Sequence, residues 1–198
     1  MAAARSLAIA DDPAAWAALG FGVDAAGAIA LGPLALHLVG REAGEGIVAL
    51  ELDRAVAGDA DGLPLRAAPP GETAGAPHPN GARAVDHVVA LTDDRDRTAD
   101  ALAAAGGDVR RRGGPPALPA PMAFVRFGPL IVEVAERTGS DLSRARWWGV
   151  TITVGDLDAA AAIIGVEPRG AVQPGRRILT VPREAGLGTA VALMSPRP

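Results

Sequence analysis

A histidine and a glutamate each stand inside an otherwise apolar run of the chain. The run at His87 reads DHVVALTDD and the run at Glu133 reads LIVEVAE. Both runs are short and rich in apolar or β-branched residues, which is typical of buried strands. Alternate side chains of a strand share a face, so Glu133 lies between Ile131 and Ala135 and needs a partner once it is buried. His87 is the obvious partner, and an imidazole beside a carboxylate can transfer a proton or anchor a polar ligand.

The segment that contains this histidine has the signals of a strand, a helix and three further strands. Asp94 supplies an N-cap after the first apolar run, and Gly106-Gly107 end the helix. DVRRR, MAFVRFG and PLIVEVAE then read as strands, and the last two meet at a Gly-Pro turn. The Pro/Gly segment 113–121 between them predicts an irregular loop that overhangs the sheet. Residues 84–137 therefore predict a β-α-β-β-β module.

The same order of elements recurs twice more. Residues 146–196 repeat the strand, the N-cap at Asp156 and the glycine stop, and RRILTV and TAVALM supply later strands. Near the N-terminus Asp12 is the N-cap, and Pro13 takes the first helical position, where a missing N–H costs nothing. A Gly-Pro turn into an apolar strand occurs both in LGPLALHL and in FGPLIVEV. The sequence thus predicts three modules in tandem.

These modules divide the chain into two parts and a linker. Residues 1–56 hold a degenerate N-terminal module and an extra strand, GIVALELD, which resembles the first strand of a fourth copy whose remaining elements are absent. Residues 57–83 are rich in Ala, Gly, Pro and Asp and predict a linker in which His78 is exposed. Residues 84–198 hold the two paired modules, 84–137 and 146–196.

Tandem modules that open with D-H-V-V and close on an apolar strand with a central glutamate resemble the vicinal oxygen chelate superfamily. This superfamily contains glyoxalases, bleomycin resistance proteins, methylmalonyl-CoA epimerases and extradiol dioxygenases. The resemblance covers residues 84–196 well, where the chain looks like a glyoxalase-like protein, and the N-terminal half weakly. It implies an α+β fold in which paired βαβββ modules curl a mostly antiparallel sheet into a cup, with the helices outside.

The resemblance also implies a divalent metal at the base of the cup, held by the first and last strands of each module. Carried over residue by residue, the second copy supplies His87 and Glu133. The third copy has Gly149 and Ala192 at the corresponding places, and neither side chain can donate to a metal. In the first copy His37 stands at the place of Glu133, without a histidine partner, so we expect a neighbour to satisfy it.

Three interpretations of the pair His87 and Glu133 therefore stay open. The pair is half of a metal site completed by substrate, water or another residue, so that a divalent metal is a candidate cofactor. Alternatively it is a metal-free general base or hydrogen-bonding anchor in the cup, with no cofactor. In the third interpretation it is an ion pair that only holds two strands together.

Aromatic and basic residues near this pair are candidates for ligand contacts. Trp147 and Trp148 are adjacent in a strand and must point to opposite faces, so that one is core and Trp148 can stack on a planar ligand. Phe124 is a further candidate contact. If Arg126 and Arg176 face the cup, they favour an anionic ligand; if they face outward, they keep the sheet soluble. The run Arg110 to Arg112 is expected to be a solvated strand end.

Composition excludes several classes of function. The net charge of −4 and the pI near 5.4 give no basic surface for nucleic acid. No apolar run approaches the roughly 20 residues of a membrane span, and no signal peptide is evident, so we expect a cytoplasmic protein that binds no membrane. The chain has no cysteine, and it shows neither a Gly-rich phosphate loop nor a nucleophile elbow.

The residues and the resemblance together predict a protein that binds a small organic molecule without a complete metal site. The alternative is a lyase, isomerase or dioxygenase that depends on a divalent metal. A homodimer is also open, because partner modules in this superfamily often come from a second subunit.

Overall fold

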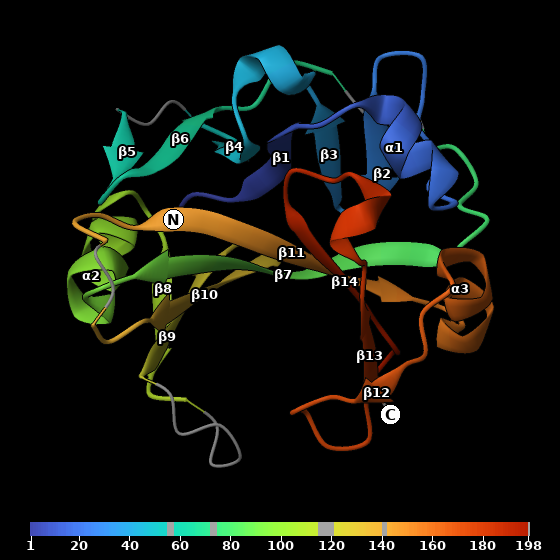
Figure 1. Cartoon of the computed structure of the whole chain (residues 1–198). Coiled ribbons are helices and arrows are strands. Elements are labelled where there is room, and N and C mark those ends of the chain that lie inside the picture. The colour runs from blue at the N-terminus through green and yellow to red at the C-terminus, as the bar shows by residue number, and fades with distance from the viewer. Residues whose placement is uncertain (55–57, 72–74, 115–120, 140–141, 198) are drawn as a thin grey trace.

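The computed structural model describes residues 1–54, 58–71, 75–114, 121–139 and 142–197. It contains two β-sheets that lie one above the other (Figure 1). The first sheet comprises β1 (Ala4–Ala10), β2 (Ala28–Leu31), β3 (Leu34–Leu38), β4 (Gly46–Leu52), β5 (Asp59–Ala60) and β6 (Leu63–Ala67). The second comprises β7 (Ala82–Thr92), β8 (Asp108–Arg112), β9 (Met122–Phe127), β10 (Leu130–Glu136), β11 (Arg146–Val154), β12 (Arg169–Gly170), β13 (Arg177–Thr180) and β14 (Ala190–Met194). The helices are α1 (Pro13–Ala18), α2 (Arg95–Ala104) and α3 (Leu157–Ile164), with two short 3-10 turns at Arg41–Ala43 and Arg183–Ala185.

The second sheet is built from the two modules that the sequence predicts. Its strand order is β12-β13-β14-β11-β7-β10-β9-β8, and the two copies join where β7 and β11 pair antiparallel. Within each copy the first strand pairs parallel with the last, β7 with β10 and β11 with β14. The carboxylates of Asp94 and Asp156 each accept hydrogen bonds from two backbone N–H groups at the start of α2 and α3. The predicted α+β fold class is confirmed.

The N-terminal half repeats this arrangement in a smaller form. The first sheet has the order β2-β3-β1-β4-β6-β5. Strand β1 pairs parallel with β3 and antiparallel with β4, and β4 in turn pairs parallel with β6. The first copy has one strand fewer than predicted, since β1 and α1 are followed by β2 and β3 alone. Two further strands, β5 and β6, follow the first strand of the fourth copy, which corrects the prediction that its remaining strands are absent. The described residues of this copy contain no helix, as predicted.

The interpretation of residues 57–83 as a linker is corrected for the same reason. This segment contains β5, β6 and the first residues of β7. Leu63 and Leu65 are buried on either side of the exposed Pro64, so a period of two is present but is hidden among Ala, Gly and Pro. His78 is also half-buried rather than exposed: its Nδ1 accepts from the backbone N–H of Gly22 at 2.9 Å, and its Nε2 lies 2.8 Å from the Ala30 carbonyl.

The two sheets share one hydrophobic core. Fully buried side chains such as Leu36 and Leu50 from the first sheet and Val88 and Ile152 from the second belong to a single continuous cluster. Burial of one such side chain contributes about 1.5–3 kcal/mol, so the interface between the sheets is a large part of the stability. The helices flank the sheets in Figure 1, and α2 and α3 pack on β9, β10, β13 and β14. No helix in the described part of the chain is long and apolar enough to cross a membrane.

A buried polar cluster on the first sheet holds its central strands together. Glu51, only 1% exposed, accepts hydrogen bonds from the Ser6 hydroxyl and from Arg66 Nε at 2.8 Å, and His37 Nδ1 lies 2.6 Å from its carboxylate. Burial raises the pKa of Glu51, but the hydrogen bonds from His37, Ser6 and Arg66 outweigh it and lower this pKa to about 2. The expectation that a neighbour satisfies His37 is confirmed.

Replacing Glu51 with glutamine is expected to lower the free energy of unfolding by roughly 3 kcal/mol at pH 7. The pKa of Glu51 is lower in the folded than in the unfolded state, so its stabilisation is complete well above pH 4.5 and is lost as the pH falls towards 2. Urea denaturation of both proteins between pH 2 and pH 7 measures the difference. Glu45→Gln, at an exposed position, is the control. A pH-independent difference would contradict this account of the cluster.

Candidate binding site

An extra residue in β7 determines which polar groups face the site. In the pairing with β11, Val85 stands opposite Ile152 and His87 opposite Thr151, so Asp86 has no partner of its own. This is a β-bulge, and a bulge turns two consecutive side chains towards the same face of the sheet. Asp86 and His87 therefore project together, although strict alternation would place them on opposite faces.

A second bulge lies at the corresponding place in β11. Here Trp147 pairs with Ala90 and Gly149 with Val89, which leaves Trp148 as the extra residue. Trp147 is buried in the core at 8% exposure, whereas Trp148 is 48% exposed on the other face. The prediction that the two indoles point to opposite faces is confirmed. The two copies thus place Asp86 and Trp148 at equivalent positions over one cavity.

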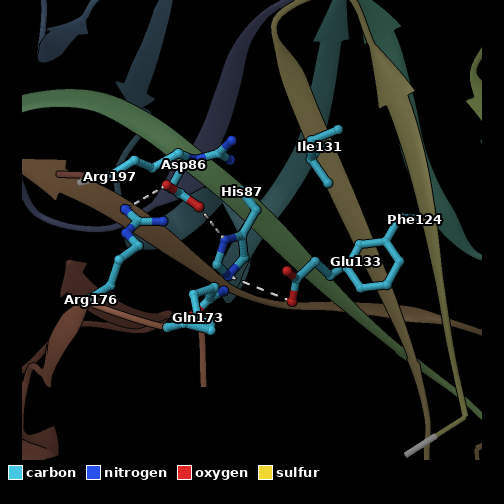
Figure 2. A pocket seen from close by; sticks show the side chains of 9 residues that line it. Asp86, His87, Phe124, Ile131, Glu133, Gln173, Arg176 and Arg197 are labelled. Atoms are coloured by element: carbon cyan, nitrogen blue, oxygen red, sulfur yellow. Dashed lines mark hydrogen bonds and ion pairs between the residues drawn. The ribbon is translucent and has the colours of Figure 1, made fainter. Parts of the chain in front are cut away.

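We call this cavity the cup; it consists of two adjoining spaces of about 500 Å³ and 360 Å³. Both are lined by His87, Phe124, Glu133, Gln173 and Pro174. Figure 2 shows the side chains around the smaller space. The larger space has mostly apolar walls, which include Val89, Met122, Trp148, Val150, Val172, Ile178, Ala190, Ala192 and Met194. The smaller space is lined by charged side chains as well, namely Asp86, Arg176 and Arg197. Charged side chains therefore line both spaces, since Arg111 and Arg169 also belong to the larger one.

Four charged or titratable side chains form a chain across the floor of the cup (Figure 2). Arg176 is ion-paired with Asp86 Oδ2 at 2.8 Å, and His87 Nδ1 lies 2.9 Å from Asp86 Oδ1. On the far side, His87 Nε2 lies 3.7 Å from Glu133 Oε2, which is an electrostatic contact rather than a hydrogen bond. All four side chains are largely buried. The sequence predicted the pair of His87 and Glu133, but it did not predict that Asp86 and Arg176 continue this row of side chains.

The environment gives the two carboxyl groups opposite properties. Burial raises the pKa of Asp86, but hydrogen bonds from His87 and Arg176 outweigh it and hold this pKa well below its usual range. Asp86 is thus ionised and accepts the Nδ1–H of His87, so Nε2 is the nitrogen that faces Glu133. Burial raises the pKa of Glu133 above its usual value, and the nearby His87 only partly opposes this. The floor therefore pairs a fixed anion with a carboxyl group that holds its proton more readily.

The donors at the floor do not fit a divalent metal ion. Ala192 pairs with Thr151 as Glu133 pairs with Val89, so the third copy has alanine where the second has glutamate. A Cβ atom on Gly149 would lie 2.5 Å from the carbonyl oxygen of Ala190, which leaves no room for a side chain there. The described residues contain no group of three or more His, Asp or Glu side chains arranged to hold a metal. Two donors are too few for a stable site.

The structure brings most of the predicted contact residues to the cup. Phe124 and Trp148 line it, and Arg176 lines its smaller space, although the charge of Arg176 is already neutralised by Asp86. Arg126 does not line it, because its guanidinium turns back to donate to the Gly128 carbonyl at 2.7 Å. Within the predicted overhanging loop 113–121, residues 115–120 lie outside the described residues.

Sequence reasoning missed two other groups of the cup. Asp86 was overlooked because strict alternation excludes it from the face of His87, and only the pairing with β11 reveals the bulge. Arg111 is exposed near the end of β8, as expected, but it also lines the larger space, with its guanidinium 4.6 Å from the centre of the Phe124 ring. Its neighbour Arg112 behaves as expected and pairs with Asp96 and Asp100 on α2.

Comparisons with known proteins give structural similarity only. No protein-family model matches the chain, and no curated protein is detectably similar in sequence. A methylmalonyl-CoA epimerase from Mycobacterium tuberculosis is 16% identical over 58% of this chain and 88% of its own, with a TM-score of 0.47. A Streptomyces coelicolor methylmalonyl-CoA epimerase variant in complex with 2-nitronate-propionyl-CoA is 20% identical over 58% and 97%, with a TM-score of 0.45. A hypothetical protein from Bacillus halodurans is 13% identical over 58% and 94%, with a TM-score of 0.46. Similarity of this degree assigns neither a ligand nor an activity.

Removing the buried ion pair at the floor is expected to destabilise the protein. Asp86→Ala leaves the guanidinium of Arg176, 4% exposed, without its anion, and such a loss costs about 3–5 kcal/mol. Arg176→Ala and the double variant complete a cycle that measures the coupling by urea denaturation. The exposed pair Arg177 and Asp158, at 2.9 Å in the same module, is the control and should contribute below about 1 kcal/mol. Equal losses at both pairs would show that Asp86 does not hold the floor.

The stability of Glu133→Gln should exceed that of the wild type increasingly as the pH rises. The pKa of Glu133 is higher in the folded than in the unfolded state, so ionisation at higher pH disfavours folding, and glutamine removes this cost. Thermal denaturation from pH 4 to pH 8 measures the difference in Tm. Glu184→Gln, at an exposed position, should show no such trend. A constant difference between Glu133→Gln and wild type would exclude a buried, proton-holding carboxyl.

Proposed function

We propose that this protein binds a small organic molecule in the cup and does so without a metal ion at the floor. The observation that carries the proposal is the larger space of about 500 Å³, whose walls are mainly apolar and whose floor bears His87 and Glu133. This volume and this mixture of walls are typical of small-molecule sites, which use a few polar groups to orient a largely buried ligand. The ion pair that only holds strands together would not require such a space.

The walls favour a ligand with a planar or apolar body. Trp148 is 48% exposed although it is a large aromatic side chain, and Val172 on the same wall is 43% exposed. Exposed apolar side chains that gather in one concavity are characteristic of binding surfaces. His87 and Glu133 supply a hydrogen-bonding anchor at the opposite end of the ligand. A metal-dependent lyase, isomerase or dioxygenase would need further donors besides these two.

A second candidate is metal-free acid–base catalysis on the bound molecule. Asp86 fixes the orientation of His87, and burial raises the pKa of Glu133, which together resemble the tuning of a general acid or base. For any ligand found, deuterium exchange of its acidic C–H groups in D₂O, followed by NMR, separates the two candidates. Exchange that Glu133→Gln abolishes supports catalysis, and binding without exchange supports the binding protein alone.

Ligands of the cup are expected to change the fluorescence of Trp148. Trp16 and Trp147 are buried, so Trp148 is the indole that a ligand can contact. A screen of planar and apolar metabolites should yield compounds that alter this fluorescence saturably, and the response should fall in Trp148→Phe. Ala192→Phe fills the larger space and should abolish binding, whereas Ala159→Phe at an exposed position of α3 should leave it unchanged. Ligands that still bind Ala192→Phe with full affinity would contradict the proposal.

A further inference from the structure

We propose that the ligand of the cup carries an anionic group, such as a carboxylate or a sulfonate, on its apolar body, and that Arg111 and Arg169 bind this group. This inference rests on the proposed function and specifies its ligand class. Both arginines line the larger space together with Trp148 and Val172. The same ligand would therefore meet apolar walls and cationic side chains at once.

The balance of charge around the cup is positive, although the whole chain has a net charge of −4. The charged side chains that line the cup are Asp86, Arg111, Glu133, Arg169, Arg176 and Arg197. Asp86 and Arg176 neutralise each other at 2.8 Å, and burial disfavours the ionised form of Glu133, an effect that the nearby charges of His87 and Arg111 partly oppose. Among the described residues, no carboxylate lies within ion-pair distance of the other three arginines. A concave site with unpaired cations attracts anions.

Arg111 is held in place while its donors stay available. Its guanidinium lies 4.6 Å from the centre of the Phe124 ring, a cation–π contact that restricts the side chain. A stacked guanidinium keeps its N–H groups directed outward in its own plane, where they can bind a carboxylate or sulfonate. The adjacent Arg112 is already occupied by Asp96 and Asp100 on the other side of the strand. Only Arg111 of these two is free to meet a ligand.

Arg169 approaches the same space from the opposite edge of the sheet. Arg111 lies on β8 and Arg169 on β12, and these are the two edge strands of the eight-stranded sheet. The curled sheet brings both edges over one cavity, since both arginines line it. Trp148 and Val172, the exposed apolar side chains of this cavity, lie in the third copy with Arg169. This arrangement suits a molecule that combines an apolar body with an anionic group.

A matched pair of fluorescent probes tests the preference for an anion. The probes are 8-anilinonaphthalene-1-sulfonate and the uncharged N-phenyl-1-naphthylamine, which share the same aromatic body. We expect the sulfonate to bind with one-to-one stoichiometry and about tenfold more tightly than the uncharged probe, because its charge meets two arginines. Arg111→Gln and Arg169→Gln should each weaken sulfonate binding by roughly three- to tenfold, with less than about a twofold effect on the uncharged probe. Arg183→Gln, at an exposed position in the turn Arg183–Ala185, should change neither.

The outcomes separate this inference from the proposed function. Circular dichroism first establishes that each variant is folded. If both probes bind with equal affinity and Ala192→Phe removes both, the cup binds small molecules but the preference for an anion is wrong. Unchanged sulfonate binding in both arginine variants would also overturn the inference. If neither probe gives a saturable signal that Ala192→Phe removes, the proposed function itself fails.

Discussion

The pairing of β7 with β11, in which Asp86 and Trp148 are extra residues, determines the chemistry of the cup. The bulge at Asp86 turns a carboxylate to the same face as His87, where it accepts the Nδ1–H of the imidazole. Arg176 then compensates the charge of Asp86. Without the bulge, this aspartate would face the core between the two sheets and would lack a partner there. One local irregularity thus fixes the orientation of His87 and leaves its Nε2 and Glu133 as the groups that a ligand can meet.

The same irregularity has a different result in the other copy. The bulge of β11 presents the indole of Trp148, and the next residue is Gly149, which has no space for a side chain. Two modules of the same topology therefore contribute a charged floor and an apolar wall to a single cup. The first sheet treats its own polar residues differently: Ser6, His37, Glu51 and Arg66 satisfy one another. That cluster stabilises the strands, whereas the cup retains polar groups that can bind a ligand.

The sequence predicts the elements better than it predicts the contacts between them. Asp94 and Asp156 act locally as N-caps, and the period of two places His87 and Glu133 on matching strands, so these features follow from the sequence alone. Asp86 faces the cup only because of its register with β11, which no local pattern records. The strands β5 and β6 are short, and β6 contains Pro64, so their pattern is weak; β6 forms by pairing with β4, and β5 by pairing with β6. The side-chain positions of Arg111 and Arg126 likewise depend on their partners in the fold, namely the Phe124 ring for Arg111 and the Gly128 carbonyl for Arg126.

The central claim is that the floor of the cup supplies only two metal donors and works without a metal. The metal content of the purified protein tests this claim most directly. The protein is incubated in turn with manganese, cobalt, nickel and zinc ions and then desalted. Its metal content is measured by inductively coupled plasma mass spectrometry. The account predicts that no ion is retained in stoichiometric amount, because Nε2 of His87 and the carboxylate of Glu133 are only two donors and the third copy adds no ligand. Retention of one ion per chain, lost in Glu133→Ala, would contradict it.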